Sequence, residues 1–164
     1  PCPCGNLGRD SKVCTCAIQD IQRYWRRLGG PLLDRIDLRV PLRPALARDL
    51  LGPPGEDSSA VRSRVEAARR IQARRYAGLG FLRNGRIPPG LVERFCPLGP
   101  GVAAVLDRAV DGLSLSSRAC HGILRVARTI ADLEGREGLE EDDILEAVQH
   151  RRYGDGDYFW QDGR

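Results

Sequence analysis

The sequence contains no methionine and a single lysine, Lys12, so arginine carries nearly all of the positive charge of these 164 residues. The first residue is a proline, and together with the absence of methionine this predicts that the chain is a fragment of a longer polypeptide. No run of residues approaches the roughly 20 apolar positions that span a bilayer, and no signal-like hydrophobic segment opens the chain. We therefore expect a cytoplasmic protein without a membrane partner.

The motifs of a nucleotide hydrolase are also missing. There is no glycine-rich phosphate loop with a lysine, and no strand followed by a paired-carboxylate motif. The two histidines, His121 and His150, have neither a Ser–Asp pair nor a metal-ligand set nearby, so neither is assigned a catalytic role. On its own the chain lacks the parts to hydrolyse a nucleotide. Its net charge of +4 permits contact with nucleic acid without requiring it.

Cysteine is concentrated at the start of the chain. Four of the six cysteines follow the spacing C-x-C-x9-C-x-C, at Cys2, Cys4, Cys14 and Cys16. Turn-forming residues lie between the two pairs, which predicts a loop and not a helix. Two close pairs of thiolates can supply a tetrahedral zinc site, which would staple a loop too small to bury a core. The alternatives are one or two disulfides, disfavoured because nothing else suggests export, or four ordinary thiols.

A second feature is Arg35, which lies between two acidic residues in the stretch 30–38 (GPLLDRIDL). A guanidinium held on a short turn ahead of a strand can be presented to a partner's phosphate, because it is always charged and donates two parallel hydrogen bonds. The alternative is a surface salt bridge from Arg35 to Asp34 or Asp37. The residues themselves leave both interpretations open.

The secondary structure around this turn follows from the apolar pattern. A helix is predicted over residues 17–28, and alternation of apolar residues over 36–42 predicts a half-buried strand. Proline, glycine, aspartate and serine dominate residues 44–59, which indicates a linker. The remainder has helical periodicity, and we expect helices over about residues 60–76, 88–95, 101–113, 118–134 and 141–151.

Arg118 lies in the first turn of a strongly amphipathic helix, for which Ser116 or Ser117 is the expected cap. The helix dipole favours anions at that end, so a bound phosphate would make an arginine useful there. A plain surface arginine is the alternative.

Several stretches match a known family when they are taken together. In the first part of the chain they are residues 1–5 (PCPCG), 21–24 (IQRY) and 30–37 (GPLLDRID). Further on they are residues 58–59 (SS), 64–69 (RVEAAR), 94–98 (RFCPL) and 124–133 (LRVARTIADL). As a set they closely resemble the magnesium-chelatase-like AAA+ ATPases of the ComM (YifB) family, over nearly the whole chain except its tail.

The resemblance implies a ring-forming ATPase, a hexamer, whose Walker A and B motifs would lie before residue 1 and would bind most of the ATP and Mg²⁺. The family is associated with DNA branch migration during natural transformation, so DNA is an implied partner. Arg35 is similar to the arginine finger, which reaches the γ-phosphate held by a neighbouring subunit. Arg118 is similar to the sensor-2 arginine of the lid. The four cysteines, Cys2 to Cys16, resemble the family's cysteine-rich insertion, which supports Zn²⁺.

The same resemblance sets the expected architecture, which is mainly α. Residues 1–43 would form the C-terminal end of an AAA+ α/β core, with one helix, one strand and the cysteine-rich loop. Residues 44–59 would be a linker, 60–153 the helical lid and 154–164 a disordered tail. Two other functions stay open: a zinc-stapled nucleic-acid-binding module without enzymatic activity, and the motor subunit of a metal chelatase, which the cysteine-rich loop disfavours.

Overall fold

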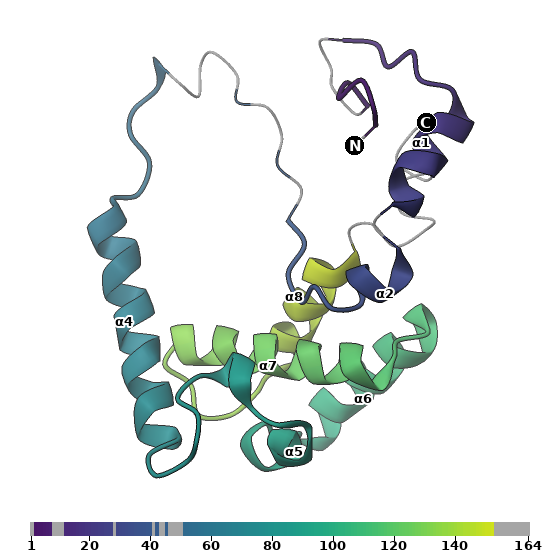
Figure 1. Cartoon of the computed structure of the whole chain (residues 1–164). Coiled ribbons are helices and arrows are strands. Elements are labelled where there is room, and N and C mark those ends of the chain that lie inside the picture. The colour runs from purple at the N-terminus through teal and green to yellow at the C-terminus, as the bar shows by residue number, and fades with distance from the viewer. Residues whose placement is uncertain are drawn as a thin grey trace. The chain divides into compact units, whose positions relative to one another are not determined.

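The computed structural model describes residues 2–7, 12–27, 29–40, 42, 45 and 51–152, and these are mainly α-helical (Figure 1). The chain divides into two compact units. The first consists of Pro1–Gly52 with Arg151–Arg164, and the second of Pro53–His150. None of the helices in the described part of the chain is long and apolar enough to cross a membrane. The tail expected over residues 154–164, and residues 44 and 46–50 of the expected linker, lie outside the described residues.

The first unit contains the helices α1 (Ile18–Arg26) and α2 (Gly30–Leu33). Gly29 separates them with φ of +52°, a left-handed conformation that glycine adopts without steric cost. Its N–H donates to the carbonyl of Arg26 at 3.3 Å, and its carbonyl accepts from the N–H groups of Leu32 and Leu33 at 3.1 Å each. One glycine therefore ends α1 and starts α2, which fixes the entry to the turn that carries Arg35.

The strand predicted over residues 36–42 is wrong for the part of it that the structure describes. Residues 36–40 and 42 have no regular secondary structure, and the side chains of Leu38 and Leu42 are 54% and 89% exposed. Alternation of apolar residues shows which face would be buried, but a strand also needs a neighbour to pair its backbone groups. No described segment supplies that neighbour. The mainly helical part of the predicted fold class is confirmed, and the α/β core is not seen among the described residues.

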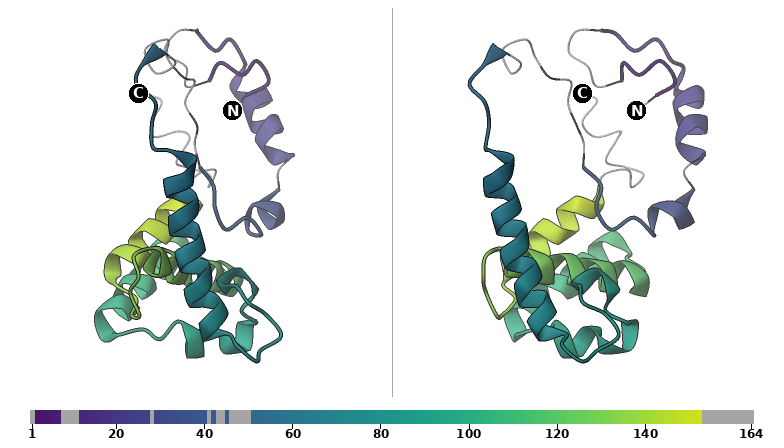
Figure 2. Two further views of the ribbon diagram at one scale, coloured as in Figure 1. Left: turned by 90° about the vertical axis from the view of Figure 1, so that its left-hand side faces the viewer. Right: turned by 60° about the vertical axis from the view of Figure 1, so that its left-hand side comes forward.

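The second unit is a helical domain built around α7 (Figure 2). In chain order its elements are α4 (Ser58–Arg75), η1 (Asn84–Arg86), η2 (Pro89–Leu91), α5 (Val92–Phe95), α6 (Pro100–Leu113), α7 (Ser117–Leu133) and α8 (Glu141–Arg152), of which the last two residues belong to the first unit. Elements α4, η1 and α5 all pack against α7. The Oγ of Ser116 accepts the N–H of Ala119 at 3.1 Å, so Ser116 is the cap of α7.

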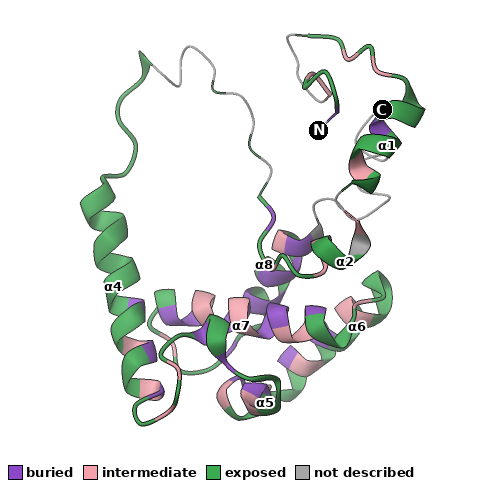
Figure 3. Ribbon diagram, viewed as in Figure 1, coloured by how far each residue is buried: buried purple, intermediate pink, exposed green. Residues whose placement is uncertain are grey.

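Apolar side chains from α5, α6, α7, α8 and the loops between them form one core, and much of α7 is buried in Figure 3. Ile123, Ala127 and Ala131 are fully buried, and Ile87 and Ile144 pack into the same core. An aromatic cluster closes one side, with the ring centroids of Tyr76 and Phe81 4.8 Å apart and those of Tyr76 and Phe95 5.0 Å apart. By contrast, residues 58–67 of α4 are all exposed.

A buried polar network fastens α4 and η1 to α7. The carboxylate of Asp132 accepts two hydrogen bonds from Arg75, at 2.8 and 2.5 Å, and one from the Asn84 amide at 2.8 Å. The Nε atom of Arg128 lies 3.2 Å from the same carboxylate. Buried charges are tolerated when they are paired in this way. Two cations and one amide therefore hold a single buried anion.

Candidate functional site

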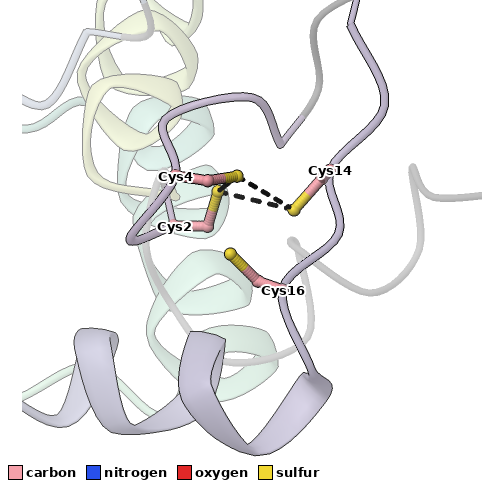
Figure 4. A group of neighbouring side chains, drawn as sticks. All are labelled: Cys2, Cys4, Cys14 and Cys16. Atoms are coloured by element: carbon pink, nitrogen blue, oxygen red, sulfur yellow. Dashed lines mark hydrogen bonds between the residues drawn. The ribbon is translucent and has the colours of Figure 1, made fainter.

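The four cysteines of the predicted zinc site converge in the first unit (Figure 4). Their Sγ atoms all lie within 4.8 Å of one another. The Sγ–Sγ distances are 3.3 Å for Cys2–Cys4, 3.7 Å for Cys4–Cys14 and 3.5 Å for Cys2–Cys14. A disulfide needs about 2.05 Å, and the cysteines are free. Tetrahedral zinc with Zn–S bonds of about 2.3 Å separates its sulfurs by about 3.8 Å, close to the spacing seen here.

Local backbone geometry builds one half of this cluster. The N–H of Gly5 donates to the carbonyl of Cys2 at 3.0 Å, and Gly5 has φ of +73°. This turn directs the N–H of Leu7 to the Sγ of Cys2 at 3.3 Å. An N–H group that donates to sulfur stabilises the thiolate, which is the form that binds metal. The glycine that follows the first cysteine pair is therefore part of the site.

The pKa values of Cys2 and Cys16 are shifted in opposite directions. Burial alone would raise the pKa of Cys2, but hydrogen bonds from Cys4 and from the N–H of Leu7, with weaker ones, outweigh it and lower the pKa to about 6. In Cys16, a hydrogen bond with the Cys4 backbone favours the thiolate, yet the Cys4 side chain and burial outweigh it and raise the pKa to about 12. One thiolate forms readily and opposes ionisation of its neighbours. A cation among the four sulfurs would remove that repulsion.

The donor set therefore fits a metal ion. Four sulfur ligands at tetrahedral spacing select zinc or iron over the hard cations Mg²⁺ and Ca²⁺, which take oxygen ligands. Cys2 is buried and Cys4 is exposed, so the cluster has a closed side and an open side.

The turn that carries Arg35 lies directly after α2. The N–H groups of Arg35 and Ile36 donate to the carbonyls of Leu32 and Leu33, each at 3.0 Å. The Arg35 side chain is exposed, and its Nη1 donates to the carbonyl of Pro31 at 2.6 Å. Among the described residues, Arg35 forms no ion pair. The salt bridge to an adjacent aspartate, the alternative suggested by the sequence, is therefore not what the structure contains.

The two aspartates instead pair with Arg151, a residue that no sequence pattern indicated. Its Nη2 lies 3.2 Å from Asp34 Oδ1, and its Nη1 lies 3.1 Å from Asp37 Oδ1. These partners are 117 and 114 residues away along the chain. No local pattern reveals such a pair, because periodicity and turn composition act over a few residues.

Arg118 lies in the first turn of α7, two residues after the cap Ser116, and its side chain is exposed. It can thus meet an anion in solution, as either a ligand-binding arginine or a plain surface arginine would. Arg118 belongs to the second unit, while Arg35 and the cysteines belong to the first. The candidate residues are therefore divided between the two units.

Two family models match the chain, one after the other. A model described as magnesium chelatase, subunit ChlI, matches residues 1–66, and one described as magnesium chelatase, subunit ChlI C-terminal, matches residues 55–151. The chain belongs to the magnesium-chelatase-like family. The first match contains the cysteine cluster and Arg35, and the second contains Arg118 and Arg151.

The relatives of this magnesium-chelatase-like chain include a protein named for competence. Competence protein ComM of Haemophilus influenzae is 41% identical over 135 residues, which is 81% of this chain and 26% of that protein. The uncharacterized protein YifB of Escherichia coli is 36% identical over 153 residues, 92% of this chain and 29% of that protein. An uncharacterized protein of Mycobacterium tuberculosis is 38% identical over 156 residues, 94% of this chain and 30% of that protein. The chain spans less than a third of the length of these relatives.

Proposed function

We propose that this chain is the C-terminal part of an AAA+ ATPase that works as an oligomeric ring, hexameric in its full form. The observation that carries the proposal is the continuous match to the magnesium chelatase family models together with an exposed Arg35 that has no carboxylate partner among the described residues. ATP and Mg²⁺ would be bound mainly by the rest of the protein. The chain itself contributes two arginines and a metal site.

Arg35 acts on a phosphate that a neighbouring subunit holds. In phosphoryl transfer, negative charge spreads over the γ-phosphoryl oxygens, and an arginine supplied in trans stabilises that charge. Such a residue is worth about 10³–10⁵ in kcat. The exposed guanidinium of Arg35 meets the first requirement of this role, because a finger must reach beyond its own subunit.

Arg118 acts from the lid. Arg118 is an exposed residue of the first turn of α7, whose N–H groups already favour an anion, so its guanidinium and the helix end would bind one phosphate together. In this role Arg118 senses whether nucleotide is present and links its hydrolysis to movement of the lid.

The test of the finger uses the full-length protein with Arg35→Ala. We expect ATP turnover to fall by about 10³-fold or more, while nucleotide binding is retained. Arg23→Ala is the matched control, since Arg23 is an exposed arginine of the same unit that pairs only with Asp20 among the described residues, at 3.2 Å. Turnover should also return when Arg35→Ala subunits are mixed with subunits that cannot bind ATP. Full turnover by Arg35→Ala alone would end the assignment.

The work done by this ATPase is proposed to be DNA branch migration in recombination or natural transformation. Support comes from the relative named competence protein ComM. The measurement is ATP-dependent conversion of a synthetic four-way junction by the full-length protein. A metal-chelatase motor, the alternative from the same family, would instead have its ATP turnover stimulated by a porphyrin-binding partner.

We propose Zn²⁺ as the ion of the cysteine cluster. Its four sulfur ligands would be Cys2, Cys4, Cys14 and Cys16, and the ion would hold together a loop too short to form a core of its own. Bound zinc supplies folding energy in such a loop and takes no part in the phosphoryl transfer.

Nucleic-acid binding without catalysis is the second candidate function, and α4 favours it. The first half of this helix is exposed, and its surface arginines are Arg62, Arg64, Arg69, Arg70 and Arg74. Arg64 is engaged by Glu56 ahead of the helix start. The others can neutralise phosphates, which gives affinity without sequence readout.

A further inference from the structure

The side chain of Arg151, which belongs to the first unit, is 3% exposed and is held by the turn that carries Arg35. Its Nη2 donates both to the backbone carbonyl of Asp34 at 3.1 Å and to Asp34 Oδ1 at 3.2 Å. Its Nη1 donates to Asp37 Oδ1 at 3.1 Å. One guanidinium therefore binds the residue before Arg35 and the residue two positions after it.

A second arginine braces the same arrangement. Arg39 is buried, and its Nη1 donates to the carbonyl of Arg151 at 2.7 Å. Its Nη2 donates to the carbonyl of Leu33 at 2.8 Å, which is the last residue of α2. Arg39 thus binds the backbone carbonyls of Leu33 and Arg151. Arg151 in turn binds the carboxylates of Asp34 and Asp37.

The pairing of Arg151 with Asp34 and Asp37 affects Arg35 because it engages the two carboxylates next to Arg35 in the chain. Asp34 and Asp37 are the nearest acidic neighbours of Arg35 in sequence, so their carboxylates are available to compete for its guanidinium when nothing else binds them. Both carboxylates are instead engaged by Arg151, and the guanidinium of Arg35 donates to a backbone carbonyl. A guanidinium that is already paired with a carboxylate is less able to stabilise a phosphate.

We infer that Arg151 is a positioning residue for Arg35: it holds Asp34 and Asp37 away from the finger so that Arg35 can act on a neighbouring subunit's nucleotide. This inference rests on the proposed finger role of Arg35. Arg151 itself touches neither nucleotide nor reacting atoms. It acts by pairing with the two carboxylates that would otherwise compete for the guanidinium of Arg35.

The experiment measures ATP turnover of the full-length protein with Arg151→Ala alone and with Arg151→Ala combined with Asp34→Asn and Asp37→Asn. We expect Arg151→Ala to lower kcat by about 10- to 100-fold, since small misplacement of a catalytic group costs about 10²-fold, with little change in KM for ATP. The triple variant should recover most of the loss, because no carboxylate then competes for Arg35. Gln149→Ala, an exposed position in the last turns of α8, is the matched control.

The rescue separates positioning from plain structural support. If Arg151 only stabilised the fold, turnover would rise and fall with the thermal midpoint of each variant, and loss of turnover that tracks this midpoint would overturn the inference. Unchanged kcat in Arg151→Ala would overturn it as well. The Arg35→Ala variant is measured alongside: if it is inactive while Arg151→Ala is fully active, the finger stands and only the role of Arg151 falls. Should Arg151→Ala fail to fold, judged by its thermal midpoint, Arg151→Gln replaces it in both backgrounds.

Discussion

Among single residues, the cysteines give the most direct test of a bound ligand. With Cys16→Ser, one of four sulfur ligands is replaced by an oxygen that binds zinc poorly. We expect one zinc per chain in the unaltered protein and at least about a tenfold loss of zinc affinity in the variant, given that even outer-shell changes cost about 10–100-fold. The measurement is metal content by mass spectrometry after dialysis against a weak chelator.

Cys120→Ser is the matched control for that variant, because Cys120 lies in α7, outside the cluster. It should retain zinc in full. Absence of zinc from the unaltered protein, when purified without chelator, would contradict the assignment.

A second residue, Asp143, makes the stability of the helical unit depend on pH. Burial raises the pKa of its carboxyl, but hydrogen bonds from Arg136, at 2.8 and 2.7 Å, and from the N–H of Glu140, at 2.8 Å, outweigh burial and leave the pKa below its ordinary value. A lowered folded-state pKa means that the stabilisation is complete above the unfolded value of about 3.9 and is lost as pH falls through the folded value.

Asp143→Asn should therefore lower the free energy of unfolding by about 2 kcal/mol at pH 7, the range for hydrogen bonds to a charged group. The difference from the unaltered protein should shrink as pH falls below about 3.9 and through the lower pKa of the folded state, where the carboxyl takes up its proton. Urea unfolding at a series of pH values measures both effects. Asp142→Asn, at the neighbouring exposed position, should change neither. A constant difference across this pH range would show that the charge of Asp143 is not responsible.

At the scale of elements, α4 presents an exposed surface rich in arginine. Arg62 and Arg69 are seven residues apart, so they lie on one face two turns from each other. If that face binds DNA, the double variant Arg62→Ala, Arg69→Ala should weaken binding equally for all sequences and reduce the salt slope by about 0.9 for each phosphate that is no longer neutralised. Fluorescence anisotropy with duplex DNA at several salt concentrations gives the slope. Arg108→Ala, an exposed arginine of α6, should leave it unchanged.

The helices show what sequence can predict. Expected helices near residues 101–113, 118–134 and 141–151 are observed as Pro100–Leu113, Ser117–Leu133 and Glu141–Arg152. Each has a local start and stop signal and an apolar stripe, so local rules suffice. The expected strand failed because a strand depends on a pairing partner elsewhere. The short helix expected near 88–95 is observed as a 3-10 turn, η2, followed directly by the α-helix α5.

In the candidate site too, local patterns were predicted and long-range pairings were not. The cysteine cluster was predicted from spacing, because four thiols within about fifteen positions of a turn-rich loop are forced near one another. Arg35 and Arg118 were singled out by their places in a turn and in the first turn of a helix, and resemblance to a family supplied their specific roles, which remain predictions. Arg151 and the network around Asp132 were missed, since both join residues that are far apart in the chain and carry no motif.

For the whole molecule, the pairing of Arg151 with the turn that carries Arg35 has a consequence for synthesis. The turn leaves the ribosome first, and its partner follows 117 residues later. At about 5–20 residues per second, that interval is about 6–23 s. Within residues 30–40, Arg35 and Arg39 are the cations that the two aspartates can meet during this time. If Arg35 is the proposed finger, a nascent chain acquires it in an active form only when α8 is complete, and a ring built from earlier subunits would contain fingers paired with their own aspartates.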